Sequence, residues 1–184
     1  MKNTLLIILV LAVVLGAYGF MTYNGLVTSN EVVNNQWAQV ETQYQRRFDL
    51  IPNLVESVKG IMQQEQTIFT AIAEARTRYS GAQTTDEKAA AAGEVESALG
   101  RLLVVVENYP QLKSAENVQT LMAQLEGTEN RISTERKRFN DAVQVYNLKV
   151  KTLPSSLIAK ITGFIEHAYF ESVSGSDTAP QVQF

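Results

Sequence analysis

The sequence contains no cysteine and only one histidine, His167. Without cysteine the chain can form no disulfide bond, thiol nucleophile or cysteine-ligated metal site. One histidine cannot supply the paired Glu-x-x-His motifs of di-iron helical bundles, and no HExxH, GxSxG or GxxxxGKS/T motif is present. Carboxylate pairs such as Glu126/Glu129 are more typical of a solvated helix face than of a metal site. We therefore predict no enzyme activity and no catalytic, cofactor-binding or metal-binding residues.

Charge is also scarce. The chain has 16 basic and 19 acidic residues, a net charge of −3, and so lacks the basic face that nucleic-acid binding requires. We expect no nucleic-acid partner. Charged residues make up 19% of the chain, below the ~25% that is usual for soluble domains. The deficit lies at the N-terminus, where no charged residue occurs between Lys2 and Glu31.

The uncharged stretch predicts a membrane anchor over residues 1–23. Thr4 to Tyr23 is 20 residues long, and at ~1.5 Å per residue a helix of this length crosses the ~30 Å hydrocarbon core. Tyr18, Phe20 and Tyr23 lie at its far end, where interface aromatics occur. The alternative is a cleaved signal peptide. It is disfavoured because the stretch exceeds the ~7–15 apolar residues of such signals and no clear small-x-small site ends it.

The anchor predicts a single-pass protein of the cell membrane, in contact with the lipid bilayer. Lys2 precedes the span, and Arg46 is the first basic residue after it. The positive-inside rule then favours an N-terminus in the cytoplasm and a bundle outside it.

The remaining chain predicts helices. It has only four prolines and no runs of alternating β-branched residues. The expected elements are a long first helix bent or interrupted near Pro52, an apolar face continuing to about residue 75, a helix over 88–106 that begins at a Thr85-Asp86-Glu87 cap, a longest helix over 115–152, and a last helix from 157 to about 170 capped by Ser155-Ser156. The composition of residues 172–184 predicts a disordered tail.

The helix predicted over residues 115–152 carries a seven-residue apolar repeat from Val118 to Leu153. Such a repeat indicates knobs-into-holes packing in an elongated bundle. Two positions of the repeat are charged, Glu129 and Arg136, and an unpaired buried charge is costly. Either both residues lean to the edge of the bundle, or they pair in an ionic layer with other helices. Candidate partners are Arg46, Arg47 and Asp49.

A dense polar cluster follows the first apolar part of the body and consists of Arg46, Arg47, Asp49, Pro52 and Asn53. One hypothesis is a contact surface for another subunit or partner. The other, which we favour, is a packing and capping cluster. Together with Glu129 and Arg136, these residues are the predicted interaction or structural sites.

Three blocks of residues resemble the LemA family. They are YNGLV at 23–27 with Trp37 and RRFDLIPNLV at 46–55, then ENYPQLK at 107–113 with LEGTENRI at 125–132, and finally Phe139-Asn140 with Tyr146-Asn147. The resemblance extends from Tyr23 to about Phe170. It implies an N-terminal membrane helix, an elongated antiparallel bundle of about four helices, and no known catalytic activity.

These observations together predict an all-α protein. Its parts are a transmembrane helix at residues 1–23, a helical bundle at 24–171 and the tail at 172–184. We expect a scaffolding or self-assembling role at the bacterial cell envelope, with the chain forming a homo-oligomer. The alternatives are an accessory or signalling module that binds a membrane protein partner, and a secreted helical domain.

Overall fold

The computed structural model describes residues 2–60 and 65–170. These residues form six helices: α1 (Lys2–Lys59), α2 (Gln66–Gly81), α3 (Thr85–Glu107), α4 (Pro110–Lys113), α5 (Glu116–Lys151) and α6 (Ser155–Thr162). The described part of the chain contains no strand, so the predicted all-α class is confirmed. The predicted tail at 172–184 lies outside the described residues.

Helix α1 is one continuous helix of 58 residues, whereas α5 has 36. The prediction that residues 115–152 form the longest helix is therefore wrong, because the apolar N-terminal segment continues into the first bundle helix without a break. Pro52 lies inside α1 at an exposed position, and the helix is not interrupted there. Proline removes one helical hydrogen bond, but the buried neighbours Phe48, Ile51 and Leu54 hold this part of α1 against the bundle.

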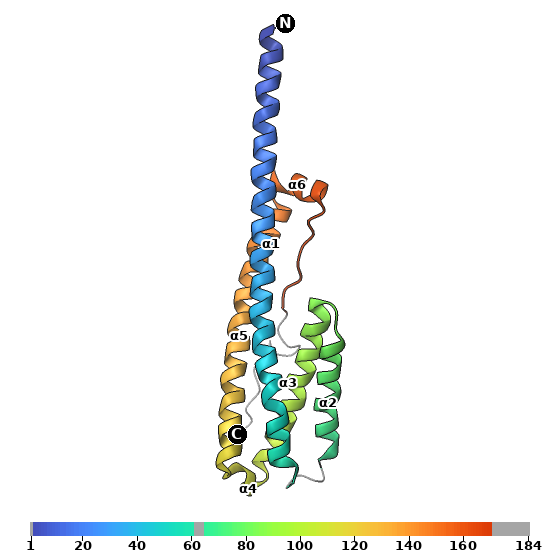
Figure 1. Cartoon of the computed structure of the whole chain (residues 1–184), viewed down its shortest axis with the longest axis vertical. Helices are drawn as coiled ribbons and strands as arrows, with labels where there is room; N and C mark the ends of the chain where they lie inside the picture. The colour runs from blue at the N-terminus through green and yellow to red at the C-terminus, as the bar shows by residue number, and fades with distance from the viewer. Residues whose placement is uncertain (1, 61–64, 171–184) are drawn as a thin grey trace, which may run out of the picture.

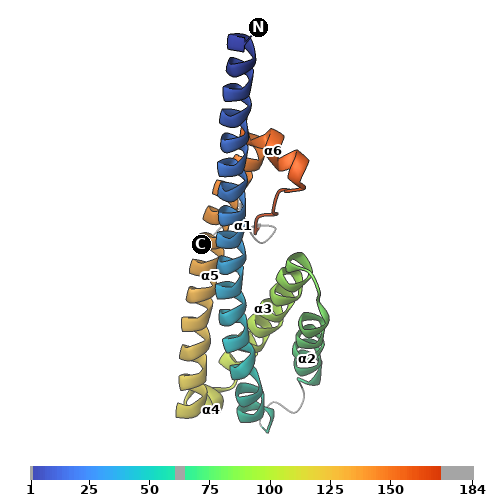
Figure 2. The ribbon, with the colours of Figure 1, turned by 45° about the horizontal axis from the view of Figure 1, so that its top comes forward.

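Two antiparallel helix pairs form an elongated bundle (Figure 1). The long helices α1 and α5 pack against each other, and the shorter α2 and α3 form a second pair beside the C-terminal part of α1. Both views place α6 across α1, at the opposite end of the bundle from α4 (Figure 2). The N-terminal part of α1 extends beyond every other described helix, and its leucine, isoleucine and valine side chains are more than half exposed.

The core lies where the two pairs meet. Its buried apolar side chains include Val40, Tyr44, Phe48 and Leu54 of α1, Ala92, Val95 and Leu102 of α3, and Ile132, Phe139 and Val143 of α5. Most apolar positions of the α5 repeat are buried, but Leu153 is 75% exposed because α5 ends at Lys151. The knobs-into-holes geometry of the repeat stays a prediction.

The N-cap of helix α3 lies one residue earlier than predicted. Thr84 is the N-cap residue, and its hydroxyl accepts a hydrogen bond from the backbone N–H of Glu87. The Glu87 carboxylate in turn accepts from the backbone N–H of Thr84. This reciprocal capping box requires a spacing of three residues between threonine and glutamate, which Thr84 meets and Thr85 does not.

The last helix is much shorter than predicted. Helix α6 ends at Thr162 because Gly163 adopts the left-handed conformation (φ 81°), which glycine tolerates and which terminates helices. The predicted continuation to Phe170 is therefore wrong. The predicted cap is also wrong, since Pro154 occupies the N-cap position and the Ser155 hydroxyl instead donates to the carbonyls of Lys149 and Thr152.

Residues 164–170, which we name the C-terminal strap, run back along the α1/α5 pair without helical structure (Figure 1). Two asparagine side chains of α5 hold the strap. Asn147 donates to the His167 carbonyl at 2.8 Å and accepts from the His167 N–H at 3.0 Å. Asn140 makes the same pair of bonds to Phe170, at 3.0 and 2.8 Å. The Phe170 ring also packs on Trp37 and Phe139.

The register of the strap follows from simple geometry. Seven helical residues separate Asn140 from Asn147 and rise ~10.5 Å. Three extended residues separate His167 from Phe170 and advance ~10 Å. The two spacings match, so both amide side chains can pair with the strap backbone at once.

We predict that Asn147→Ala frees the strap while the bundle stays folded. The substitution leaves the backbone N–H and carbonyl of His167 without partners, at a local cost of roughly 1–3 kcal/mol. Hydrogen–deuterium exchange should accelerate in residues 164–170 and stay unchanged in the core of α5. Asn130→Ala, at an exposed position of the same helix, is the matched control. Unchanged exchange in the strap of the Asn147 variant would contradict the role assigned to this side chain.

Candidate functional site

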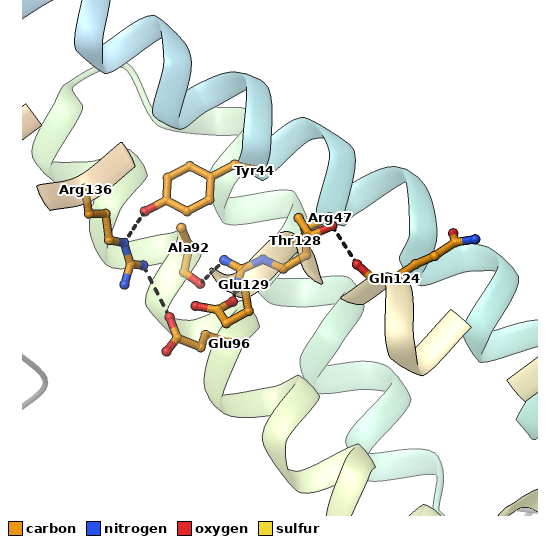
Figure 3. Close-up of polar contacts among 8 residues, drawn as sticks. All are labelled: Tyr44, Arg47, Ala92, Glu96, Gln124, Thr128, Glu129 and Arg136. Atoms are coloured by element: carbon orange, nitrogen blue, oxygen red, sulfur yellow. Dashed lines mark hydrogen bonds and ion pairs between the residues drawn. The ribbon is translucent and has the colours of Figure 1, made fainter. Parts of the chain in front are cut away.

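Arg47 is the most unusual residue of the bundle interior, because its side chain is charged and only 1% of the residue is exposed. Its Nη1 lies 2.6 Å from Glu129 Oε2 of α5, and its Nη2 donates to the Ala92 carbonyl of α3 at 3.3 Å. The guanidinium carbon lies 5.4 Å from the centre of the Tyr44 ring. One side chain of α1 thereby connects three helices (Figure 3).

Arg136 forms the second half of this polar layer. Its Nε donates to the Tyr44 hydroxyl at 3.0 Å, and its Nη2 lies 3.2 Å from Glu96 of α3. The Tyr44 ring contacts both guanidinium groups, with Arg136 Cζ 5.6 Å from its centre (Figure 3). Arginine over an aromatic face is favourable, more so where water is excluded. The layer therefore links α1, α3 and α5 a second time.

Burial and neighbouring charges act in opposite directions on these groups. Burial raises the pKa of Tyr44, and the charges of Arg136 and Arg47 offset this only in part. Burial lowers the pKa of Arg136, but Tyr44, Glu96 and Glu129 outweigh it, so the net direction is upward. At neutral pH a protonated arginine therefore donates to a neutral phenol.

The structure separates the residues that the sequence grouped together. It pairs Arg47 with Glu129, as the ionic-layer hypothesis requires, although the Glu129 side chain stays 39% exposed. Arg136 does not pair with Asp49 or Arg46. It binds Glu96 and Tyr44, which the sequence analysis did not single out.

The other members of the predicted cluster lie on the exposed face of α1: Arg46, Asp49, Pro52 and Asn53. Helical spacing explains the division, because Arg47 lies one turn after Tyr44 on the buried face while the other four members of the cluster lie on the opposite face. Asp49 accepts a bond from Gln45 of the same helix at 2.8 Å. These four residues do not cap a helix, and a role in binding another protein stays a prediction for them.

An apolar groove opens beside the polar layer, between α3 and α5. Helix α3 packs closely on α2 but not on α5, and the space between them measures about 660 Å³. Apolar side chains line it, including Leu99, Leu103, Val106, Val118, Met122 and Leu125. Four glutamates also line it, Glu96, Glu107, Glu126 and Glu129, and the first and last of them bind the layer arginines.

The groove has an acidic character, because Glu107 and Glu126 form no ion pair with any side chain that the structure describes. Arg47, the one basic residue of the lining, is already engaged. Among the same residues, no group of three or more histidine, aspartate or glutamate side chains is placed to share a metal ion. The arrangement fits the binding of an apolar surface with basic edges.

We predict that Glu129→Leu destabilises the bundle more than Arg47→Met. The first change leaves a buried guanidinium without its carboxylate. We expect it to lower the stability by about 2–4 kcal/mol, a range that allows for the partial exposure of Glu129. In the second change, the Glu129 carboxylate can turn toward water and the neutral methionine side chain fills the space of the arginine. We expect this change to lower the stability by about 1–2 kcal/mol. Urea unfolding of the full chain in detergent measures both. The double variant should lose less than the sum, and a larger loss for Arg47→Met alone would contradict this account.

The chain was compared with known proteins. The LemA family model matches residues 36–184. The magnetosome proteins MamQ 1 and MamQ 2 of Paramagnetospirillum magneticum are each 30% identical over 203 residues, which cover 96% of this chain and 75% of the relative. The magnetosome protein MamQ of Magnetospirillum gryphiswaldense is 30% identical over 191 residues, 88% of this chain and 70% of the relative. The resemblance seen in the sequence is confirmed, and the chain belongs to the LemA family as a membrane-associated helical protein.

Proposed function

We propose that this protein is a membrane-anchored, non-catalytic scaffold that holds an amphipathic helix of a partner protein in the α3–α5 groove. The groove carries the proposal, since it lies between two helices that make few close backbone contacts and is lined by the half-buried Leu103 and Met122 above the buried Leu99 and Leu125. Helix-in-groove recognition uses such a surface to bury the apolar stripe of an incoming helix. The polar layer beside it keeps α1, α3 and α5 in place while the groove stays open.

The charges around the groove define the partner. Glu107 and Glu126 lie one on each wall, and both are exposed. A helix with an apolar stripe and flanking lysine or arginine residues complements this pattern. Charges at the rim of an interface contribute mainly to the association rate and to the rejection of wrong partners. The apolar lining would supply most of the affinity.

The apolar part of α1 supports the anchor. It is the one helix in the described residues that is long and apolar enough to cross a membrane, and none of its most apolar window is buried in the protein. A core helix of a water-soluble protein would bury such residues. We propose that residues 1–23 cross the bilayer of a bacterial envelope once. The body from residue 24 then lies outside the cytoplasm, the orientation that Lys2 favours.

The interior supports a non-catalytic role. Its charged groups, Arg47 with Glu129 and Arg136 with Glu96, bind each other. A catalytic acid or base instead needs access to a substrate. His167 is part of the strap, and its Nε2 lies 2.7 Å from Asn30 Oδ1. The charge pairs thus stabilise the packing of the bundle.

A second copy of this chain fits the groove less well than a foreign helix does. Copies anchored in one membrane stand side by side at equal heights, so the groove meets the same level of its neighbour. In α5 the basic residues from Arg131 onward lie toward the anchor end, whereas the groove lies toward α4. A homo-oligomer that uses the basic residues of α5 would therefore form through other faces.

We predict that the full chain, in phosphatidylcholine nanodiscs, binds a labelled amphipathic peptide with lysine flanks more tightly than the same peptide with glutamate flanks. The variant Glu107→Lys/Glu126→Lys should reverse this preference. We expect each affinity to change about tenfold, or ~1.4 kcal/mol. Fluorescence anisotropy measures the binding.

Glu31→Lys/Glu56→Lys makes the same change in net charge at exposed positions of α1 and should leave both affinities unchanged. Equal binding of the two peptides, or no binding, would exclude the groove as the recognition site. If light scattering instead finds a dimer that the groove variant abolishes, the occupant is a second copy.

The orientation gives a further prediction. The chain has no cysteine, so Val104→Cys introduces one unique thiol at an exposed position of the body. A membrane-impermeant maleimide should label it in intact spheroplasts as completely as in lysed ones, because the body lies outside the cytoplasm. Labelling only after lysis would place the bundle inside.

A further inference from the structure

Helix α6 carries an apolar stripe that nothing in the described structure covers. The stripe consists of Leu157 and Ile161 of α6, of Leu153 just before the helix and of Ile165 just after it, and the exposed fractions of these residues lie between 56% and 82%. Ser156 and Ala159 form the opposite, buried face of the helix. Two large exposed aliphatic side chains on a short helix, with a third just before it and a fourth just after it, indicate a binding surface.

The position of α6 relative to α1 identifies what covers the stripe. A Cβ atom on Gly19 would lie 3.8 Å from Ile158 Cδ1, so α6 packs directly on α1 at this glycine. The Tyr23 ring lies 5.8 Å from the ring of Phe164, just beyond the end of α6. Both α1 residues belong to the last turns of the 20-residue apolar span. Helix α6 therefore lies at the depth where the span ends.

We infer that α6 is an interfacial helix that inserts its Leu153–Ile165 stripe into the lipid bilayer beside the anchor; this rests on the proposed anchorage of residues 1–23. With Tyr23 at the boundary of the hydrocarbon, Gly19 lies ~6 Å deeper. Interfacial helices bury their apolar face ~5–10 Å into this zone. The long axis of α6 also crosses that of α1 (Figures 1 and 2), so α6 runs along the surface that α1 crosses.

Charge in this region also fits a lipid surface. From Ala142 to Phe170 the chain has three lysines and one acidic residue, Glu166, which pairs with Lys151 at 2.7 Å. Lys160 of α6 is exposed and can reach lipid phosphates while its aliphatic stem lies on the apolar zone. A bilayer that surrounds the exposed turns of α1 would cover the stripe at the same time.

The surrounding structure keeps α6 from folding its stripe inward. The Ser155 hydroxyl binds the end of α5 through the carbonyls of Lys149 and Thr152, at 2.6 and 2.9 Å. On the other side, the strap is bound to Asn140 and Asn147. Two points of membrane contact, the anchor and α6, then fix the tilt and rotation of the bundle, and with them the direction in which the groove faces.

Single-cysteine variants of the full chain test this inference, because no other thiol competes for the label. Ile161→Cys probes the stripe, Leu9→Cys the anchor and Val104→Cys an exposed position on α3. Each variant carries an NBD fluorophore in liposomes of phosphatidylcholine and phosphatidylglycerol. Doxyl-labelled lipids quench a fluorophore within the bilayer, and iodide quenches one in water.

We expect the Ile161 label to emit at shorter wavelength than the Val104 label and to be quenched several-fold more by doxyl lipids. The Leu9 label should be quenched by doxyl lipids as well. Quenching of the Ile161 label by iodide, together with lipid quenching of the Leu9 label, would overturn the inference and leave the anchor intact. Shielding of the Ile161 label from both quenchers would mean that protein covers the stripe, and would also overturn it. Iodide quenching of the Leu9 label would overturn the anchorage itself.

Discussion

The bundle depends on a buried guanidinium. Burial of the Arg47 charge would cost several kcal/mol if it had no partner, and the structure offsets this cost only by placing α3 and α5 at fixed positions around it. Glu129 supplies the opposite charge, and Ala92 supplies a carbonyl from a third helix. Any shift of α3 relative to α1 would lose one of these contacts. Apolar packing alone would tolerate such a shift more easily, so the arginine sets the relative positions of the helices.

The same constraint accounts for the open groove. Helix α3 is tied to α1 through Arg47, through Lys88 with Glu41, and through the α2 ring of Tyr79 against Tyr44. Its link to α5 in the polar layer is the contact of Glu96 with Arg136. Nearer to α4, the two helices make few close backbone contacts. The groove lies in the space that remains between them.

Helical periodicity predicted most of the architecture, because it records which face of each helix is buried. It did not predict α6 correctly, since the apolar pattern of Leu157, Ile161 and Ile165 continues past Gly163, where the backbone turns. In a sequence, the apolar pattern of a helix that faces lipid looks the same as that of a helix that faces a protein core. Only the position of α6 next to Gly19 separates them.

For the candidate site, the seven-residue repeat correctly singled out Glu129 and Arg136 as charged positions that need an explanation. The partners depended on how α3 docks, which no local pattern records, so Glu96 and Ala92 could not be predicted. Tyr44 could have been inferred, because it lies one turn before Arg47 on the same face of α1. The sequence of α5 also contains a pattern related to the strap, because Phe139-Asn140 and Tyr146-Asn147 repeat an aromatic–asparagine pair seven residues apart. Asparagine on the buried side of a helix needs a hydrogen-bonding partner, and this repeat pointed to an extended segment alongside.

The continuity of α1 determines which partners can reach the groove. From Tyr23 to Arg47 the helix has no break, and 24 residues of helix rise ~36 Å. In the proposed anchorage, with Tyr23 at the bilayer boundary and α6 limiting the tilt, the polar layer would stand about that far from the membrane, and the groove would begin there and extend toward α4. A juxtamembrane segment of a neighbouring protein is too close to the bilayer to enter it. The partner helix that we propose for the groove must therefore belong to a soluble protein or to a domain that extends as far from the membrane as this bundle does.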